Sequence, residues 1–277
     1  MTMRPPGRRW PEYAIEAASL GLFMLSASAF AVLLEFPGSP VRHALQDATL
    51  RRVLMGLAMG ATAVALIYSP WGRRSGAHLN PATTFTFWRL GHLKGADFGP
   101  YALAQIGGGA LAMVLAGFVL GRALAAPEVH YVVTRPGPWG AGPAFAAEIL
   151  MTFILMSVVL AMSCAPRLER FTGLAVGGLV WLYIALEAPV SGTSLNPART
   201  LASAFVAHDF TALWIYLLAP TLGMALAAEL HRLRAARARA AGAPLPGGCA
   251  KLRHDPRVAC VFCGQRPGRE PESTRAH

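Results

Sequence analysis

Long apolar runs alternate with short polar segments along most of the chain. Runs of about 20 apolar residues lie at 13–34, 49–69, 98–121, 143–164, 171–188 and 211–231. A helix of about 20 mainly apolar residues is long enough to cross a hydrocarbon core roughly 30 Å thick. The pattern therefore predicts an all-α membrane protein with six transmembrane helices.

One segment between these runs occurs twice in nearly the same form. Ser75–Ala82 reads Ser-Gly-Ala-His-Leu-Asn-Pro-Ala, and Ser191–Ala198 reads Ser-Gly-Thr-Ser-Leu-Asn-Pro-Ala. The apolar runs that follow, 82–88 and 198–205, are too short to span a bilayer. Duplicated, interrupted segments at matching places in two halves of a membrane protein indicate a transport site.

The repeated segment divides the chain into two halves, 11–121 and 142–231. Each half holds three predicted spans, and because three is odd, the second half enters the membrane from the opposite side. The expected architecture is thus an inverted 3+3 repeat in which the two short segments approach each other from opposite faces. The Pro- and Gly-rich connector, 122–142, is predicted to be an ordered loop rather than a helix.

The Asn-Pro pairs explain how each short segment begins. Asparagine is a preferred N-cap residue, and proline is favoured at the first helical position, where its missing N–H costs nothing. Two re-entrant half-helices are therefore predicted. The motif residues that start them are Asn80, Pro81, Ala82, Asn196, Pro197 and Ala198.

The backbone before each half-helix is predicted to line a pore, because non-helical backbone at membrane depth is tolerated only where protein covers it or water reaches it. Two facing helix N-termini place about half a positive charge each at mid-membrane. A water that accepts hydrogen bonds from both asparagine amides would point its hydrogens away, which interrupts a proton wire, and the same field repels cations. The expected pore-lining loop residues are Gly76, Ala77, His78, Gly192 and Ser194.

Charge and composition agree with a membrane location. The chain is 54% hydrophobic and 14% charged, whereas soluble domains carry about a quarter charged residues. With the N-terminus inside, 19 of the 25 Lys and Arg residues lie on the inner side and 6 on the outer side. Cytoplasmic loops carry such an excess, which predicts a multi-pass protein of the cell membrane with both termini cytoplasmic.

This charge distribution also bears on partners and domains. The net charge of +11 fits topology and attraction to anionic lipid. Nucleic acid is not an expected partner, because no basic, aromatic-interleaved soluble domain is present. The predicted organisation is a cytoplasmic N-terminus (1–10), a channel domain (11–231) and a basic, Cys-containing cytoplasmic tail (232–277).

The paired motifs, the arginine that directly follows the second (Arg199), and a glutamate early in each half (Glu16 and Glu148) resemble the major intrinsic proteins, the aquaporin and glycerol-facilitator family. The resemblance covers about 11–231. It implies six spans plus two half-helices, one pore per subunit and a homotetramer. It also implies that Glu16 and Glu148 accept hydrogen bonds from the re-entrant loops, a sensible role because an intramembrane carboxylate needs donors.

In this family, four side chains form the narrowest point of the pore. Counting back from the motifs without gaps assigns them to Gly60, Ile184, Thr193 and Arg199. Glycine and isoleucine would make the constriction wider and less polar than that of a strict water channel. Water is the expected substrate, and glycerol, urea, ammonia and undissociated metalloid hydroxides stay open as further neutral solutes.

Two other classes of function stay open beside a passive channel. Coupled secondary transporters also use inverted repeats and broken helices, and a membrane scaffold would conduct nothing. An enzyme is not expected, since the chain shows no nucleophile–base set, no phosphate-binding loop and no intramembrane metal cluster.

The tail holds the one candidate cofactor site. Cysteine and histidine at these spacings could close a tetrahedral zinc site, and a reduced tail without metal is the alternative. The four candidate ligands are Cys249, His254, Cys260 and Cys263. No other cofactor is predicted.

Overall fold

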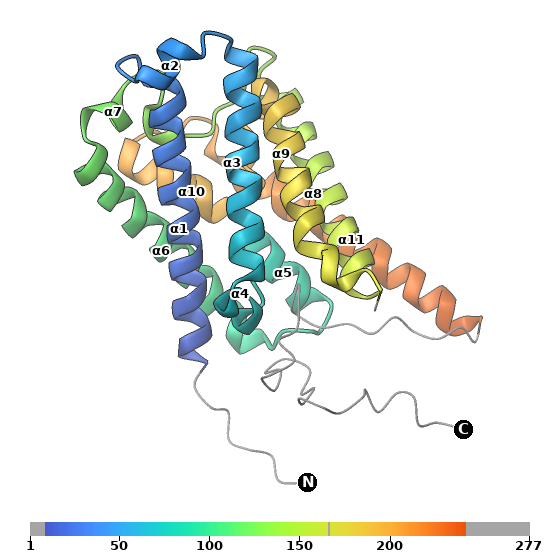
Figure 1. The fold of residues 1–277 in the computed structure, drawn as a ribbon. Coiled ribbons are helices and arrows are strands. Elements are labelled where there is room, and N and C mark those ends of the chain that lie inside the picture. The colour runs from blue at the N-terminus through green and yellow to red at the C-terminus, as the bar shows by residue number, and fades with distance from the viewer. Residues whose placement is uncertain (1–8, 166, 242–277) are drawn as a thin grey trace.

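The computed structural model describes residues 9–165 and 167–241, and this part of the chain is built from helices joined by short loops (Figure 1). Six helices are long and apolar enough to cross a membrane, which confirms the predicted spans. They are α1 (Trp10–Glu35), α3 (Ala48–Tyr68), α6 (Gly95–Leu120), α8 (Ala141–Ser163), α9 (Thr172–Ser191) and α11 (Leu213–Ala240). The last of them continues well past the predicted end at residue 231.

The two predicted half-helices are present as α5 (Pro81–Arg89) and α10 (Pro197–Ala207). Short helical segments also lie in the connections between the longer helices. They are α2 (Pro40–Ala44), α4 (Pro70–Ser75), α7 (Arg122–Ala125), η1 (His130–Val132) and η2 (Glu169–Phe171). Because α7 and η1 lie inside 122–142, the prediction of a connector without helix was wrong in part.

The two halves pack in the same way. Helix α1 packs on α6 as α8 packs on α11, while α3 and α9, the second spans of the two halves, pack on each other. Each half-helix contacts the third span of the opposite half, α5 on α11 and α10 on α6. In Figure 1, α5 lies nearer the end of the bundle where α1 begins, and α10 lies nearer the other end. This exchange of half-helices is the arrangement expected of an inverted repeat.

The contact between α3 and α9 depends on two glycines that face each other. A Cβ added to Gly60 would lie 2.4 Å from the Gly177 carbonyl oxygen, and one added to Gly177 would lie 2.6 Å from the Gly60 carbonyl oxygen. A side chain at either position would force the helices apart. The pair therefore fixes the close approach of the two central helices.

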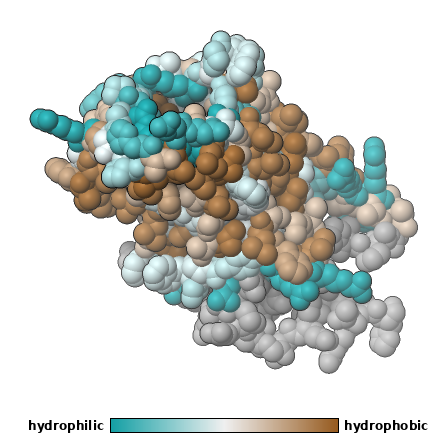
Figure 2. Space-filling view, turned by 45° about the horizontal axis from the view of Figure 1, so that its top comes forward, coloured by the Kyte–Doolittle hydropathy of each residue, from teal (hydrophilic) through white to brown (hydrophobic). Residues whose placement is uncertain are grey.

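The surface matches a bilayer environment. Hydrophobic residues cover the side of the bundle, and hydrophilic residues gather toward its two ends (Figure 2). Large apolar side chains on the long helices are strongly exposed, among them Leu103, Phe118 and Leu186. An exposed apolar surface of this extent is unfavourable in water, so the chain is a multi-pass membrane protein.

Candidate functional site

An asparagine caps each half-helix, as predicted. The Asn80 Oδ1 accepts a hydrogen bond from the Ala82 N–H at 2.9 Å. The Asn196 Oδ1 accepts from the N–H groups of Ala198 and Arg199, at 3.0 and 3.3 Å. Both helices then begin at proline, whose fixed φ suits the first helical position.

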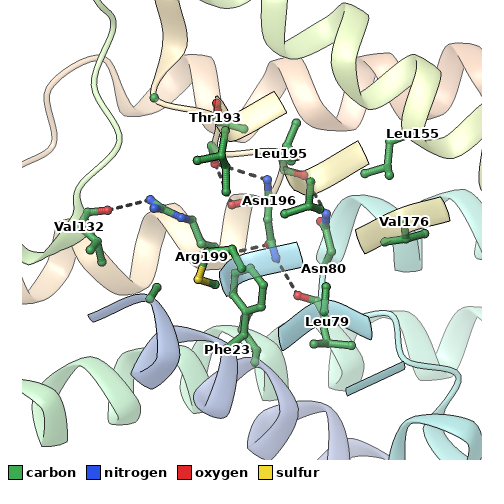
Figure 3. Close-up of a pocket in the computed structure, with 18 of the residues that line it drawn as sticks. Phe23, Leu79, Asn80, Val132, Leu155, Val176, Thr193, Leu195, Asn196 and Arg199 are labelled. Atoms are coloured by element: carbon green, nitrogen blue, oxygen red, sulfur yellow. Dashed lines mark hydrogen bonds between the residues drawn. The ribbon is translucent and has the colours of Figure 1, made fainter. Parts of the chain in front are cut away.

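The starts of the two half-helices are joined by reciprocal hydrogen bonds. The Asn80 Nδ2 donates to the Leu195 carbonyl at 2.8 Å, and the Asn196 Nδ2 donates to the Leu79 carbonyl at 2.7 Å (Figure 3). An amide NH₂ carries two hydrogens. Among the described contacts each asparagine commits one of them to the opposite loop, which leaves the second for a bound molecule.

The loops before the asparagines share an unusual backbone conformation. The φ angles of Ala77 and Leu79 are 54° and 51°, and those of Thr193 and Leu195 are 53° and 58°. Non-glycine residues rarely adopt this left-handed region, and such residues cluster at functional sites. The conformation occurs at matching positions in both halves, next to the carbonyls that meet the opposite asparagine.

A buried glutamate holds the loop of the first half. The Glu16 Oε1 accepts from the Ser75 hydroxyl at 2.7 Å and from the His78 N–H at 3.0 Å. Its Oε2 accepts from the Leu79 N–H at 2.6 Å and from the Gln105 Nε2 at 2.8 Å. Four donors converge on this fully buried carboxylate, which agrees with the predicted loop-supporting role.

Glu148 holds the second loop in the same way. Its Oε1 accepts from the Ser191 hydroxyl at 2.9 Å and from the Ser194 N–H at 2.6 Å, while its Oε2 accepts from the Leu195 N–H at 2.8 Å. This side chain is also fully buried. The loop-supporting role predicted for Glu148 therefore agrees with its contacts as well.

Two tyrosines that the sequence did not predict as site residues complete the supports. The Tyr101 hydroxyl donates to the Ser75 carbonyl at 2.8 Å, and the Tyr216 hydroxyl donates to the Ser191 carbonyl at 2.6 Å. Each lies near the start of the third span of its half. This matching position was the sequence signal that could have identified them.

A cavity of about 470 Å³ runs beside the asparagines. Its wall includes α3 residues from Ala48 to Ile67, a stretch of about 28 Å at 1.5 Å per residue. That length approaches the hydrocarbon thickness of a bilayer, about 30 Å. Asn80 and Asn196 both line the cavity, so the head-to-head half-helices border a passage along most of the membrane depth.

Most of the predicted loop residues lie where expected, since Ala77, His78, Gly192 and Ser194 line the cavity. Gly76 is not among the residues that line the cavity. It ends α4 with φ at 103°, a left-handed turn that glycine adopts without strain.

Of the six motif residues, only Asn80 and Asn196 line the cavity. The remaining motif residues begin the half-helices and pack beside them, without lining the cavity: Pro81, Ala82, Pro197 and Ala198.

Three of the four residues predicted for the constriction, Ile184, Thr193 and Arg199, line the cavity, and Gly60 does not. Gly60 faces Gly177 on α9. Successive residues on a helix are separated by about 100° of rotation. An error of one position in counting back from the motif therefore selects a residue on the face of α3 that packs on α9 and misses the face that lines the cavity.

Met59, the residue before Gly60, lines the cavity where Gly60 was expected. Met55, Met59 and Ala63 are spaced four apart on one face of α3, and all three line the cavity. Thus α3 presents methionine to the passage, and the opening expected from glycine is absent.

Three hydrogen bonds orient the polar side of the constriction, and none of them was predicted. The Arg199 Nη1 donates to the Val132 carbonyl at 2.8 Å (Figure 3). The same nitrogen donates to the Thr134 hydroxyl at 3.2 Å. The Thr193 hydroxyl donates to the Glu187 Oε2 at 2.7 Å. Every residue has a backbone carbonyl, so nothing in the sequence identified Val132 as a partner of Arg199. Glu187, by contrast, was visible in the sequence as a carboxylate within the predicted span 171–188.

A polar cluster fastens the connector between the halves to the end of α10. The Asp209 Oδ2 lies 2.9 Å from the His130 Nε2 and accepts from the Arg135 Nε at 2.5 Å, while its Oδ1 accepts from the Thr211 N–H at 3.0 Å. Burial alone would raise the pKa of Asp209, but these hydrogen bonds outweigh it and hold that pKa below its usual range.

The tail residues proposed as zinc ligands, Cys249, His254, Cys260 and Cys263, lie outside the described residues. Within 9–165 and 167–241, no group of three or more His, Cys, Asp or Glu residues is placed to hold a metal ion.

The amino-acid sequence is similar to those of known proteins. The family model described as major intrinsic protein matches residues 11–231. The chain is 37% identical over 204 residues to Aquaporin NIP6-1 of Arabidopsis thaliana, covering 73% of this chain and 65% of that protein. It is 36% identical over 181 residues to Aquaporin NIP1-4 of Oryza sativa subsp. japonica, covering 65% of this chain and 64% of that protein. The chain thus spans just under two thirds of the length of these relatives.

A solved structure has a similar fold. The aquaglyceroporin from Plasmodium falciparum superposes with a TM-score of 0.66 at 19% sequence identity, over 80% of this chain and 95% of that one.

Proposed function

The chain belongs to the major intrinsic protein family, and from this premise we propose that it is a passive channel for water and small uncharged solutes. One observation carries the proposal. Two asparagine-capped half-helices meet head to head, and both asparagines line a cavity that extends along α3 for most of the membrane depth.

The asparagine pair supplies the basis for excluding protons. A water molecule between Asn80 and Asn196 would accept a hydrogen bond from the uncommitted amide hydrogen of each. Its own two hydrogens then point away from the pair along the passage, which breaks the continuous donor sequence that proton transfer needs. The positive ends of the α5 and α10 dipoles act at the same place and disfavour cations.

Arg199 adds a fixed charge to this barrier. Its guanidinium is held by the Val132 carbonyl and the Thr134 hydroxyl, so it stays beside the passage. A guanidinium remains protonated at any physiological pH. A cation would have to pass it without a compensating partner, whereas a neutral solute gains a hydrogen-bond donor.

The composition of the constriction supports solutes larger than water. Met59 and Ile184 form apolar walls, while Thr193 and Arg199 are polar. A small molecule with one polar and one apolar edge, such as glycerol, fits a passage of this mixed character. Methionine is flexible and adapts its shape, so we propose that small polyols and urea pass as well as water.

The same proposal includes orientation and assembly. The start of α1 and the end of α11 lie toward the same end of the bundle (Figure 1). Helix α11 ends in an arginine-rich turn, which favours a cytoplasmic location for that end by the positive-inside rule. A homotetramer in the cell membrane, with a pore in each copy, would cover part of the exposed apolar surface.

Stopped-flow light scattering on proteoliposomes tests the proposed function. Under an impermeant osmolyte the vesicles should shrink much faster than protein-free vesicles, and under glycerol or urea they should shrink and then swell again. Shrinkage no faster than that of empty vesicles would favour a non-conducting scaffold. Solute flux that follows an imposed proton gradient would favour a coupled transporter.

A further inference from the structure

The second half of the chain carries a carboxylate that the first half lacks. The Ser191 hydroxyl oxygen lies 2.9 Å from the Glu148 Oε1 and 3.0 Å from the Glu187 Oε2. The same oxygen accepts a hydrogen bond from the Thr193 N–H at 3.1 Å. Two acidic side chains therefore share one hydroxyl group directly behind the constriction.

Comparison of the two halves shows that the carboxylate of Glu187 has no counterpart at the matching position of the first half. In the first half, the Ser75 hydroxyl donates to Glu16, and the Ala77 N–H donates to the Ser75 hydroxyl oxygen at 3.2 Å. The residue four positions before Ser75 is Trp71, which is 60% exposed, whereas the residue four positions before Ser191 is Glu187. Support of the loop thus does not require a second carboxylate, and Glu187 needs another explanation.

Counting hydrogens argues against ionisation of both glutamates in this arrangement. A serine hydroxyl has one hydrogen, so it can donate to only one of two carboxylates at hydrogen-bonding distance. If both were charged, the second contact would set two acceptors against each other at 3.0 Å. With one proton on the pair, the protonated acid donates to Ser191, and Ser191 donates to the other carboxylate.

The hydrogen-bond pattern favours Glu187 as the site of that proton. Glu148 accepts two backbone N–H groups, from Ser194 and Leu195, which stabilise a carboxylate. The Glu187 Oε1, by contrast, is buried with no hydrogen-bond partner among the described residues. No basic side chain in the described part of the chain forms an ion pair with either glutamate. A buried, unpaired charge is far more costly than a neutral acid.

The Glu187 side chain in turn determines which hydrogen-bonding groups of Thr193 face the passage. The Thr193 hydroxyl hydrogen is directed to the Glu187 Oε2 at 2.7 Å, and Thr193 lines the cavity. Its hydroxyl therefore presents only acceptor lone pairs to a solute, and donors at the constriction come from Arg199. We propose that Glu187 is a positioning residue for the constriction that acts as a neutral carboxylic acid, an inference that rests on the proposed channel function.

Charged and titratable groups reach this region from each packed element. They are Glu148 on α8 and Tyr216 on α11, which both interact electrostatically with Glu187, together with Arg199 on α10 and Arg52 on α3, whose Nε donates to the Ala185 carbonyl. Neither arginine is bonded to Glu187. Ionising Glu187 at alkaline pH would place a second negative charge beside Glu148 without a paired cation and would break its contact with Ser191.

Transport measurements on Glu187→Ala, Glu187→Gln and the control Glu229→Ala test the positioning role. Glu229 is an exposed glutamate paired with Arg232 and Arg89. In proteoliposomes, Glu187→Ala should raise the urea-to-water permeability ratio about two- to tenfold, the effect of gaining one neutral hydrogen bond, because the freed Thr193 hydroxyl donates to the urea carbonyl. Glu187→Gln, which is neutral, should stay close to wild type. At alkaline pH the ratio should change in wild type and stay constant in Glu187→Gln.

Infrared spectroscopy tests the protonation state independently of transport. Wild type at neutral pH should show a carboxylic-acid band that is absent from Glu187→Gln, a readout that also holds if Glu187→Ala does not fold. A ratio shifted equally in Glu187→Gln and Glu187→Ala, or the absence of a band difference, would overturn the inference. If wild type conducts no water, the proposed function fails, and the positioning role fails with it even where the band is present.

Discussion

Replacing the two buried glutamates by glutamine should have unequal effects, because they accept different numbers of hydrogen bonds. Each oxygen of Glu16 accepts two donors. Whichever way a glutamine side chain is turned, its NH₂ group faces two donors. For Glu148, one oxygen accepts two donors and the other accepts only the Leu195 N–H, so glutamine can be turned to leave a single donor unsatisfied.

The expected magnitudes follow from this count. A buried donor left without an acceptor costs about 1–3 kcal/mol. Glu16→Gln should therefore destabilise the protein by about 2–6 kcal/mol and Glu148→Gln by about 1–3 kcal/mol. Because the same donors position the carbonyls of Leu79 and Leu195, water permeability should fall in the same order.

Thermal unfolding in detergent, followed by intrinsic tryptophan fluorescence, measures the stability order, and stopped-flow light scattering measures the permeability order. Glu229→Gln is the matched control, since its exposed ion pairs are worth at most about 1 kcal/mol. Equal losses in the two variants, or a Glu16→Gln protein as stable as the control, would refute the reasoning that these carboxylates hold the loops.

Other positions give further expectations. Met59→Ala should increase glycerol permeability relative to water, because it removes an apolar wall of the constriction; an unchanged ratio in the vesicle assay would count against that wall. Gly60→Leu should lower the unfolding temperature through overpacking against Gly177, a cost of about 1–3 kcal/mol. A variant as stable as wild type but with altered solute selectivity would instead indicate that Gly60 lines the pore. Arg199→Val should admit methylammonium, measured as vesicle swelling, and continued exclusion would contradict its role as a cation barrier. The pKa of Asp209 is lowered in the folded protein, so the stability that this carboxylate contributes is present above the ordinary carboxyl pKa of about 3.9 and is lost as the pH falls below that value. The unfolding temperature of wild type should drop in that range, and the drop should be smaller in Asp209→Asn.

The features that the sequence predicted correctly are those encoded locally. Apolar runs of about 20 residues indicate spans without reference to their neighbours, and Asn-Pro at 80–81 and 196–197 marks the start of each half-helix. The odd number of spans in each half then dictates inversion. Even the loop-supporting role of Glu16 and Glu148 follows from the need of an intramembrane carboxylate for donors.

The features that it missed depend on rotation, on backbone atoms or on helix propensity. The choice between Gly60 and Met59 requires the orientation of α3 to within one residue, which spacing from the motif cannot supply. The Val132 carbonyl that holds Arg199 has no side-chain signature. Helix α11 continues to Ala240 because its last turns are rich in alanine and arginine, strong helix formers, although their polarity ends the hydrophobic pattern near residue 231.

The most direct test of the account measures water and proton flux in the same proteoliposomes, with light scattering for volume and an entrapped pH-sensitive dye for protons. Paired asparagines that orient a water file predict rapid osmotic shrinkage with no proton flux above that of protein-free vesicles. Proton flux that rises together with water flux, or shrinkage at the rate of bare lipid, would contradict the central claim.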